Sequence, residues 1–171
     1  LATTGVSPAL AARAAGIEQT SNDALFTQLA VALLAIDRRD IARSLIEPVN
    51  MLREATRCDA VFIALLDRDE QCFGEVVAAT DNFVRVRPQV LQGKSFEAWP
   101  GLIARLGELR AVGVTDTSTY RGPMQAAAAE LSRVHVGSCL MIGACSAPDD
   151  KDVPCAVIGL INEAPCDRWS M

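Results

Sequence analysis

An unbroken apolar run is the feature that most constrains how this chain can fold. No polar residue interrupts the segment from Ala60 to Leu66, and the polar connection 67–70 separates it from a second segment typical of a strand, Cys72–Thr80. Two such segments joined by a short polar connection predict a β-hairpin. Because a strand without polar positions must be shielded on both sides, we expect layers that cover both faces of the sheet.

The chain after this hairpin alternates strands with helices. We expect a strand, a helix, a short strand, a helix that begins with Pro123 in its first turn, and a second hairpin across the polar connection 146–152. The expected ranges are Phe83–Leu91, Phe96–Leu109, Ala111–Thr115, Pro123–Ser132, Ser138–Cys145 and Cys155–Asn162. Hairpins separated by helices predict an α+β fold, with an antiparallel sheet of about five to six strands and helices packed on both faces.

Two helices are expected before the first hairpin. The first runs from Asn22 to Ile36, capped by Ser21 or Asn22, and its apolar residues are spaced four, three and four apart. This stripe consists of Leu25, Leu29, Ala32 and Ile36. It predicts a homodimer through the N-terminal helices, and packing of the stripe on the chain's own sheet is the alternative.

The second of these helices, Asp40–Arg57, contains Pro48. Proline lacks an amide donor and disfavours helical angles in the residue before it, so we expect a kink or a short break there. The predicted organisation is an N-terminal lead-in and helix over residues 1–40, followed by one folded domain over 41–171.

Charge and hydropathy exclude two classes of partner. The net charge is -5, and the Lys and Arg residues are scattered rather than gathered into the basic stripe of a nucleic-acid binder. The longest apolar run, Leu29–Ile36, is too short to cross a bilayer, so no membrane partner is expected. No basic segment followed by an apolar stretch marks a secretory signal, so we expect a cytoplasmic protein. A start at Leu1 and a stop at Met171 are typical of a fragment cut from a longer chain.

Six cysteines, at positions 58, 72, 139, 145, 155 and 166, match neither paired metal ligands nor a dense disulfide framework. We therefore expect buried free thiols and no metal site. The alternative is a redox sensor, because Cys139 and Cys145 share one face of a predicted strand and Cys155 could approach Cys145.

No complete catalytic motif accompanies the single histidine, His135, so we predict no enzyme and a structural role for His135 at the start of a strand. Gly93-Lys94-Ser95 imitates the end of a phosphate-binding loop. However, Pro88 stands where that motif requires a glycine.

Four segments, in order, resemble the GAF family of sensory domains. They are Arg53–Asp67, Ser95–Pro100, Val136–Ile142, and Val157–Asn162 with the exit Asp167–Ser170. The likeness covers about residues 41–170 and implies a GAF/PAS-like sheet. It also implies a sensory or regulatory role in a bacterial signalling protein, such as a histidine kinase, diguanylate cyclase or phosphodiesterase. In the family the exit leads through a helix to an output domain, which would lie C-terminal to this chain.

The residues that define the family's better-known ligand classes are not matched in this sequence. Bilin-binding members place a cysteine in the segment that corresponds to Tyr120–His135, where this chain has none. The cyclic-nucleotide signature is poorly matched by Asn82, Lys94 and Phe96, and the cysteine trio of the methionine-sulfoxide-reducing members is not reproduced. The resemblance therefore implies a sensor whose ligand or cofactor is unknown.

We predict a small-molecule pocket on the sheet face that the two later helices cover. Apolar walls with a few polar groups are typical of such sites. The predicted walls are Phe96, Trp99, Tyr120 and Met124, the floor is Cys139 and Met141, and the polar contacts are Ser95, Tyr120 and Arg121. A register slip of one residue would put Ser138, Leu140 and Ile142 on the floor instead. If the side chains close the space, the alternative is a structural dimerisation module without a ligand.

Overall fold

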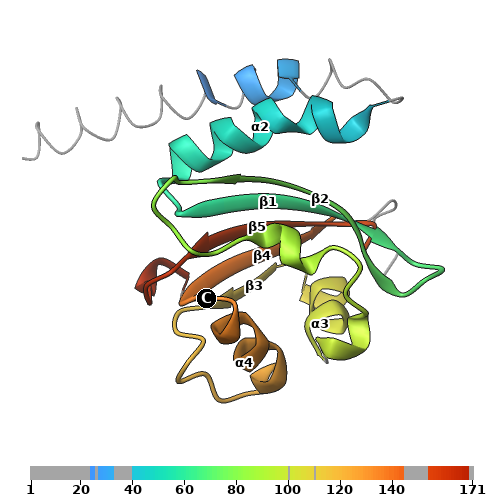
Figure 1. Cartoon of the computed structure of the whole chain (residues 1–171), viewed down its shortest axis with the longest axis vertical. Helices are drawn as coiled ribbons and strands as arrows, with labels where there is room; N and C mark the ends of the chain where they lie inside the picture. The colour runs from blue at the N-terminus through green and yellow to red at the C-terminus, as the bar shows by residue number, and fades with distance from the viewer. Residues whose placement is uncertain are drawn as a thin grey trace, which may run out of the picture.

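A five-stranded antiparallel sheet with the strand order β2-β1-β5-β4-β3 lies at the centre of the computed structural model (Figure 1). The strands are β1 (Ala60–Asp67), β2 (Cys72–Thr80), β3 (Ala111–Val114), β4 (Ser138–Ala144) and β5 (Ala156–Asn162). The structure describes residues 24–25, 27–32, 40–99, 101–109, 111–144 and 154–169. The predicted α+β architecture and both predicted hairpins are confirmed.

The two faces of the sheet are covered by different elements (Figure 1). One face carries the long helix α2 (Ile41–Thr56). The other carries α3 (Leu102–Leu109), α4 (Gln125–Arg133) and the segment 81–99, which we call the strap. Within the strap lie two short 3-10 helices, η1 (Pro88–Leu91) and η2 (Phe96–Ala98).

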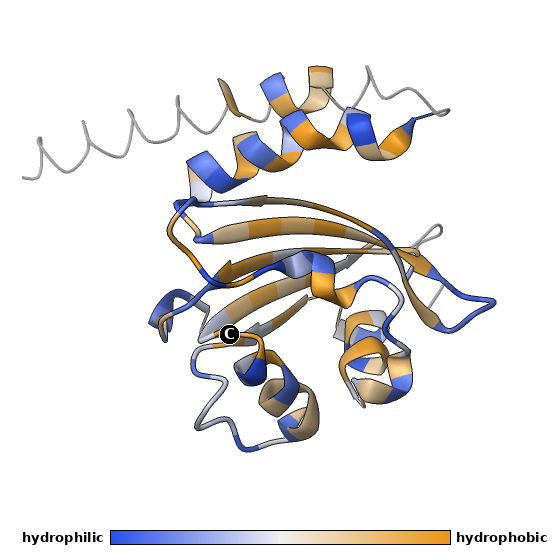
Figure 2. Ribbon diagram, viewed as in Figure 1, coloured by the Kyte–Doolittle hydropathy of each residue, from blue (hydrophilic) through white to orange (hydrophobic). Residues whose placement is uncertain are grey.

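Successive side chains of β1 point alternately toward the two faces of the sheet. Val61 and Ile63 pack toward α2, whereas Phe62 and Ala64 belong to the core beneath α3 and α4. Figure 2 shows β1 and β5 hydrophobic over most of their length, while the tip of the β1–β2 hairpin is hydrophilic. The unbroken apolar run is thus explained by a strand that is buried on both sides.

Helix α2 begins where the Asp40 carboxylate accepts a hydrogen bond from the amide of Arg43 at 3.2 Å. It ends at Arg57, whose left-handed backbone (φ 53°) stops further helical turns. The predicted break at Pro48 is wrong, because the helix continues through it as one element. The proline ring is fully buried, and this burial offsets the loss of one backbone hydrogen bond.

The strand predicted over Phe83–Leu91 is also wrong. This part of the strap forms no ladder, and its amides at Arg85 and Val86 instead donate to the side chain of Glu163. At its far end the strap forms an isolated bridge between Cys72 and Ser95, beside which the Phe73 amide donates to the Lys94 carbonyl oxygen at 2.9 Å and the Phe73 carbonyl oxygen accepts the Gly93 amide at 2.6 Å.

Both later helices begin later than predicted. Gly101 has a φ of 79°, outside the range of a right-handed helix, so α3 starts at Leu102 and leaves η2 as a separate turn. Helix α4 starts at Gln125 after the N-cap Met124, and Pro123 therefore precedes it. The predicted apolar positions Trp99, Leu102, Ile103 and Leu106 are nevertheless all buried.

Residues 24–25 and 27–32 are helical, and part of this segment lines a groove together with Glu47 and Met51 of α2. The stripe residues Leu25, Leu29 and Ala32 are half-buried there. The remainder of the predicted first helix, including Ile36, lies outside the described residues, as do Cys145 and the connection 146–152. No helix of the described residues is both long and apolar enough to cross a membrane.

Candidate ligand site

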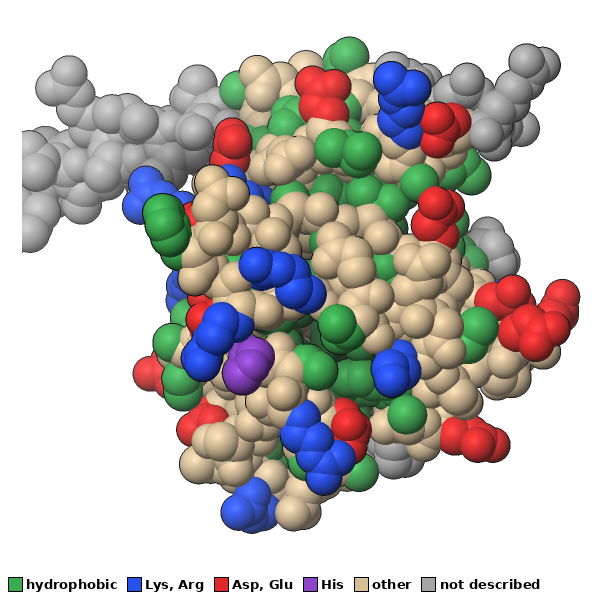
Figure 3. Space-filling model, in the orientation of Figure 1, with side chains coloured by type: hydrophobic (Ala, Val, Ile, Leu, Met, Phe, Trp, Pro, Cys, Tyr) green, Lys and Arg blue, Asp and Glu red, His purple; other side chains and the backbone are tan. Residues whose placement is uncertain are grey.

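The face between α3 and α4 is hollowed at its centre, where apolar side chains lie inside the recess and charged side chains stand at its rim (Figure 3). In the same orientation, Figure 1 places this recess between the two helices and below the strap. We call it the α3/α4 hollow. The sheet residues behind it belong to the larger of the two apolar clusters of the core.

Six of the eight residues predicted to form a pocket lie together on this face. Phe96, Trp99, Met124, Cys139 and Met141 are buried in one apolar cluster, and Tyr120 packs against it half-buried. These residues come from the strap, the loop before α4, and β4. Whether they bind a ligand stays a prediction.

The predicted strand register is right. Cys139 and Met141 point into the cluster beneath α3 and α4, whereas Leu140 packs toward α2 on the opposite face. Ser138 is fully buried, and its hydroxyl donates to the carbonyl oxygen of Ala164 at 2.8 Å.

The two remaining predicted residues lie outside this buried cluster. Ser95 is exposed, and its hydroxyl oxygen accepts the amide of Glu97 at 3.2 Å, so it caps η2. Arg121 is exposed, and its guanidinium donates to the carbonyl oxygen of Tyr120 at 2.9 Å. Both side chains thus stabilise local turns, and Tyr120 is the one predicted polar contact that packs against the buried cluster.

Two phenylalanines that the sequence reading omitted shape this face. Phe73 meets Phe96 and Trp99 edge-on, with ring centroids 5.6 and 6.1 Å apart. Phe62 covers Gly159 on the neighbouring strand so closely that an added Cβ would come within 2.0 Å of the ring. An isolated glycine inside a strand was the available signal, because it marks a close approach by another group.

The indole nitrogen of Trp99 is the most informative polar atom on this face. The side chain is only 5% exposed, and its Nε1 donor has no hydrogen-bond partner among the described residues. A buried donor without an acceptor costs roughly 1–3 kcal/mol. An acceptor supplied by a bound molecule would remove this cost.

The thiol on this face is chemically quiet. Burial raises the pKa of Cys139 to about 12, so the thiol stays protonated at neutral pH and is a poor nucleophile. On the partner strand side, the Cys155 thiol donates to the carbonyl oxygen of Ala144 at 3.1 Å. The redox alternative built on Cys139 is therefore disfavoured, and Cys145 lies outside the described residues.

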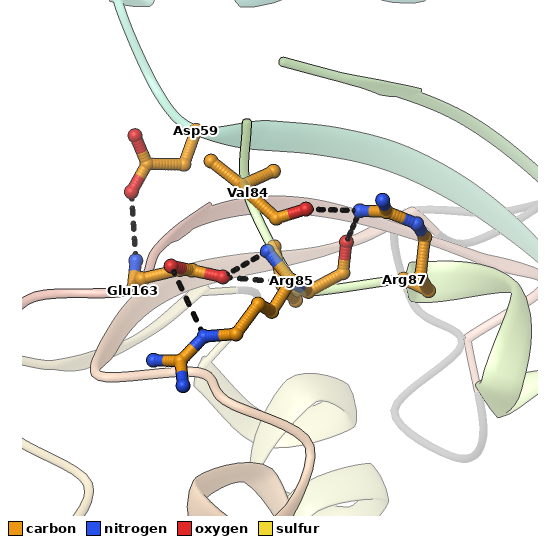
Figure 4. A network of polar contacts seen from close by, with 6 residues as sticks. Asp59, Val84, Arg85, Arg87 and Glu163 are labelled. Carbon is orange, nitrogen blue, oxygen red and sulfur yellow. Dashed lines mark hydrogen bonds and ion pairs between the residues drawn. The ribbon is translucent and has the colours of Figure 1, made fainter. Parts of the chain in front are cut away.

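Glu163 ties the strap to the end of β5 (Figure 4). Its Oε1 accepts the amides of Arg85 and Val86, the second at 2.9 Å, and its own amide donates to the Asp59 carboxylate at 2.8 Å. The Arg85 guanidinium lies 3.9 Å from the other carboxylate oxygen. This network fixes the strap where it begins to cross the α3/α4 face.

A smaller polar cleft of about 230 Å³ lies beside this network, and Arg85, Asp116, Ser132, His135 and Glu163 are among its lining residues. His135 is exposed and has a left-handed backbone, with a φ of 66°. Its amide and that of Val136 donate to the carbonyls of Ser132 and Leu131, each at 3.1 Å, which closes the end of α4 as a Schellman motif. The structural role predicted for His135 thus lies at the end of a helix, three residues before β4.

Known structures resemble this chain in fold. The phycocyanobilin-bound GAF domain of a cyanobacterial phytochrome has a TM-score of 0.62 at 13% identity, covering 84% of this chain and 80% of that one. The GAF domain of an Acinetobacter phosphoenolpyruvate-protein phosphotransferase has a TM-score of 0.53 at 19% identity, with coverages of 84% and 79%. A substrate complex of the free methionine-R-sulfoxide reductase of Neisseria meningitidis has a TM-score of 0.55 at 15% identity, with coverages of 84% and 73%. No family model and no curated protein matches the sequence.

Proposed function

We propose that this chain, whose fold is that of a GAF domain, is a sensory domain that binds a small molecule in the α3/α4 hollow. In this proposal the domain is regulatory rather than catalytic and acts in the cytoplasm. The structural change caused by ligand binding passes to an output domain of a larger signalling protein. Binding would shift the balance between two arrangements of the covering elements.

The unpaired Nε1 donor of Trp99 is the observation that carries this proposal. It lies in an apolar cluster beneath a hollowed face, so a ligand with one hydrogen-bond acceptor would gain both apolar contact and a buried hydrogen bond. The phytochrome GAF domain that resembles this chain holds a bilin, and the reductase holds its substrate. We infer a largely apolar ligand with a carbonyl or other acceptor, bound without a covalent link to α4, which contains no cysteine.

The two tryptophans of the chain give a matched test, because Trp169 also has a buried, unpaired indole nitrogen but packs on the α2 face. The probe is 8-anilinonaphthalene-1-sulfonate, which combines apolar rings with a sulfonate acceptor. We expect Trp99→Phe to weaken its binding by roughly three- to tenfold, the value of one hydrogen bond, and Trp169→Phe to leave it unchanged. Native mass spectrometry of the chain purified from cells would identify a natural ligand.

Equal binding of the dye by both variants and the unchanged chain would contradict the proposal. It would favour the alternative that this face is packed shut and that the domain only relays a signal. That alternative is supported by Phe62, whose ring already fills the space above Gly159.

We also propose that the domain forms a homodimer through its helical layer. A groove of about 590 Å³ runs between α2 and residues 27–32, and Val31 and Ile46 on this layer are 62% and 51% exposed. Since Leu25 and Leu29 are already half-buried, the exposed residues are the better candidates for contact with a second copy. Light scattering should give a dimer mass that Val31→Asp and Ile46→Asp reduce to a monomer; a monomer mass for the unchanged chain would contradict this.

A further inference from the structure

The end of the described chain returns to the point where α2 passes into β1. In Figure 1 the 3-10 helix η3 (Asp167–Trp169), drawn in red, lies at the same end of the sheet as the start of β1. Trp169 is buried in the α2-face cluster together with Cys58, and Cys166 packs against that cluster half-buried. Two cysteines that are far apart in sequence therefore border one small apolar region.

The guanidinium of Arg168 lies between the two thiols: it contacts that of Cys166 directly and shares a carbonyl oxygen with that of Cys58. Arg168 Nε donates to the Cys166 sulfur at 3.3 Å, and Arg168 Nη1 donates to the Thr56 carbonyl oxygen at 3.2 Å. The Cys58 sulfur lies 3.8 Å from the same carbonyl oxygen. The guanidinium carbon also lies 5.3 Å from the centre of the Trp169 ring, which helps to fix its position.

The surroundings give the two thiols different reactivity. The hydrogen bond and the charge of Arg168 lower the pKa of Cys166, so this half-exposed thiol carries more thiolate at neutral pH than an ordinary cysteine. Burial raises the pKa of Cys58, which keeps that thiol protonated. One reactive thiolate beside one protected thiol is the arrangement of an attacking and a resolving cysteine.

We propose that Cys166 and Cys58 form a reversible disulfide when the domain meets a hydroperoxide. The Cys166 thiolate attacks the peroxide, the O–O bond breaks, and Cys166 becomes a sulfenic acid while the other oxygen leaves as water or an alcohol. The Cys58 thiol then attacks the sulfenic sulfur while its proton passes to the sulfenic oxygen, so that the S–S bond forms as the S–O bond breaks and water leaves. The two thiols are oxidised by two electrons, and the peroxide is reduced by two.

The disulfide would join Cys58, two residues before β1, to the segment that leaves β5. It would hold η3 against the end of α2 and so change the path of the chain as it leaves the sheet. This inference does not depend on the α3/α4 hollow, because its residues lie on the opposite face or at the sheet's end, and it uses none of the residues proposed for the dimer.

The test treats the full chain with hydrogen peroxide and maps its peptides without reduction. We expect the free thiols to fall by two, a peptide pair joined through Cys58 and Cys166, and recovery of both thiols with dithiothreitol. Cys58→Ala should leave Cys166 as a sulfenic acid that dimedone traps, and Cys166→Ser should leave Cys58 reduced. Cys72→Ser, at another half-buried cysteine, is the control that should not alter the linkage.

A second measurement needs no change at the buried position. Arg168→Gln removes the charge beside Cys166, so the rate at which iodoacetamide alkylates Cys166 at pH 7 should fall by about threefold or more. Three outcomes would overturn the proposal: a linkage through other cysteines, a disulfide that forms only between chains, or an alkylation rate of Cys166 equal to that in the urea-unfolded chain.

Discussion

The two faces of this sheet are covered in different ways. One 16-residue amphipathic helix, α2, covers its face with a continuous apolar stripe that includes Leu45 and Val49. The other face is covered by two helices of 8 and 9 residues and by the strap, which has little regular structure. Helices this short are not stable by themselves, so their positions depend on contacts with the sheet.

In the proposed sensory role, this difference points to the part of the domain that would respond to a ligand. Elements held by few backbone ladders open at lower free-energy cost than a long helix packed on a sheet. The α3/α4 face, with its hollow and its unpaired Trp99 donor, is therefore the side on which a ligand could change the structure. The α2 face carries the junction between the sheet and the exit segment.

The largest expected effect is the loss of an aromatic ring from the responsive face. Phe62 is fully buried, and Phe62→Ala should lower the free energy of unfolding by about 3–5 kcal/mol because it leaves a cavity above Gly159. Leu45→Ala, the matched truncation on the α2 face, should cost about 2–5 kcal/mol. Urea unfolding followed by circular dichroism gives both values.

The same two variants should also differ in how much dye they bind, and this difference compares the two faces. The cavity left by Phe62→Ala should increase the amount of 8-anilinonaphthalene-1-sulfonate that binds, while Leu45→Ala should not. If the Leu45 variant gained as much dye binding as the Phe62 variant, the contrast between a responsive and a closed face would be wrong.

A smaller effect is expected where Glu163 holds the strap. Hydrogen bonds to a charged acceptor contribute about 1.5–3 kcal/mol, so Glu163→Ala should destabilise the domain by roughly that amount. Glu163→Gln keeps an acceptor oxygen and should cost less. Hydrogen exchange should quicken at the amides of Arg85 and Val86 in the alanine variant, while the amides of α2 keep their protection. Unchanged exchange at these two amides would show that the strap is held by its apolar contacts.

The sequence predicted the fold well where the determining pattern is local. The apolar runs of β1 and β5 each belong to a hairpin, where turn residues join them to the neighbouring strand. Within such a short stretch of chain, the run and the turn specify which strands pair. The strand predicted within the strap was wrong because two of its amides donate to Glu163, which lies 77 and 78 residues away in the sequence. Phe83, which was expected in that strand, is 94% exposed. No periodicity within the strap contains that information.

For the candidate site, too, the sequence predicted some residues correctly and others not. Its apolar members could be found because alternation in β4 and the spacing around Trp99 place them on one face. Ser95 and Arg121 could not be assigned, since a polar side chain beside a turn caps the backbone as readily as it lines a pocket. The contact of Arg168 with Cys166 and with the carbonyl next to Cys58 depends on the return of the chain to α2, which spacing does not reveal.

The smallest expected effect is the titration of Asp116, in the exposed loop that leads from β3 toward α4. Its Oδ1 accepts from the hydroxyl and amide of Ser118 at 2.6 and 2.9 Å and from the amide of Thr119 at 3.4 Å. Ser118, and then Thr119, hold the pKa of this carboxyl below its ordinary value because they stabilise the charged form. NMR titration should therefore give Asp116 a pKa below that of an ordinary aspartate, and Ser118→Ala should move this pKa back up.

The sign of the linked stability follows from this direction. A carboxyl whose pKa is lowered by folding stabilises the native state above its unfolded pKa, and this contribution disappears as the pH falls through the folded value. The difference in stability between the unchanged chain and Ser118→Ala should thus be present at pH 6 and shrink in strong acid. Ser132→Ala, in the same cleft, is the control and should leave the titration of Asp116 unchanged. An unshifted Asp116 would show that its carboxylate does not hold the loop, and it would leave Thr117, whose hydroxyl donates to the Val136 carbonyl oxygen, as the side chain that does.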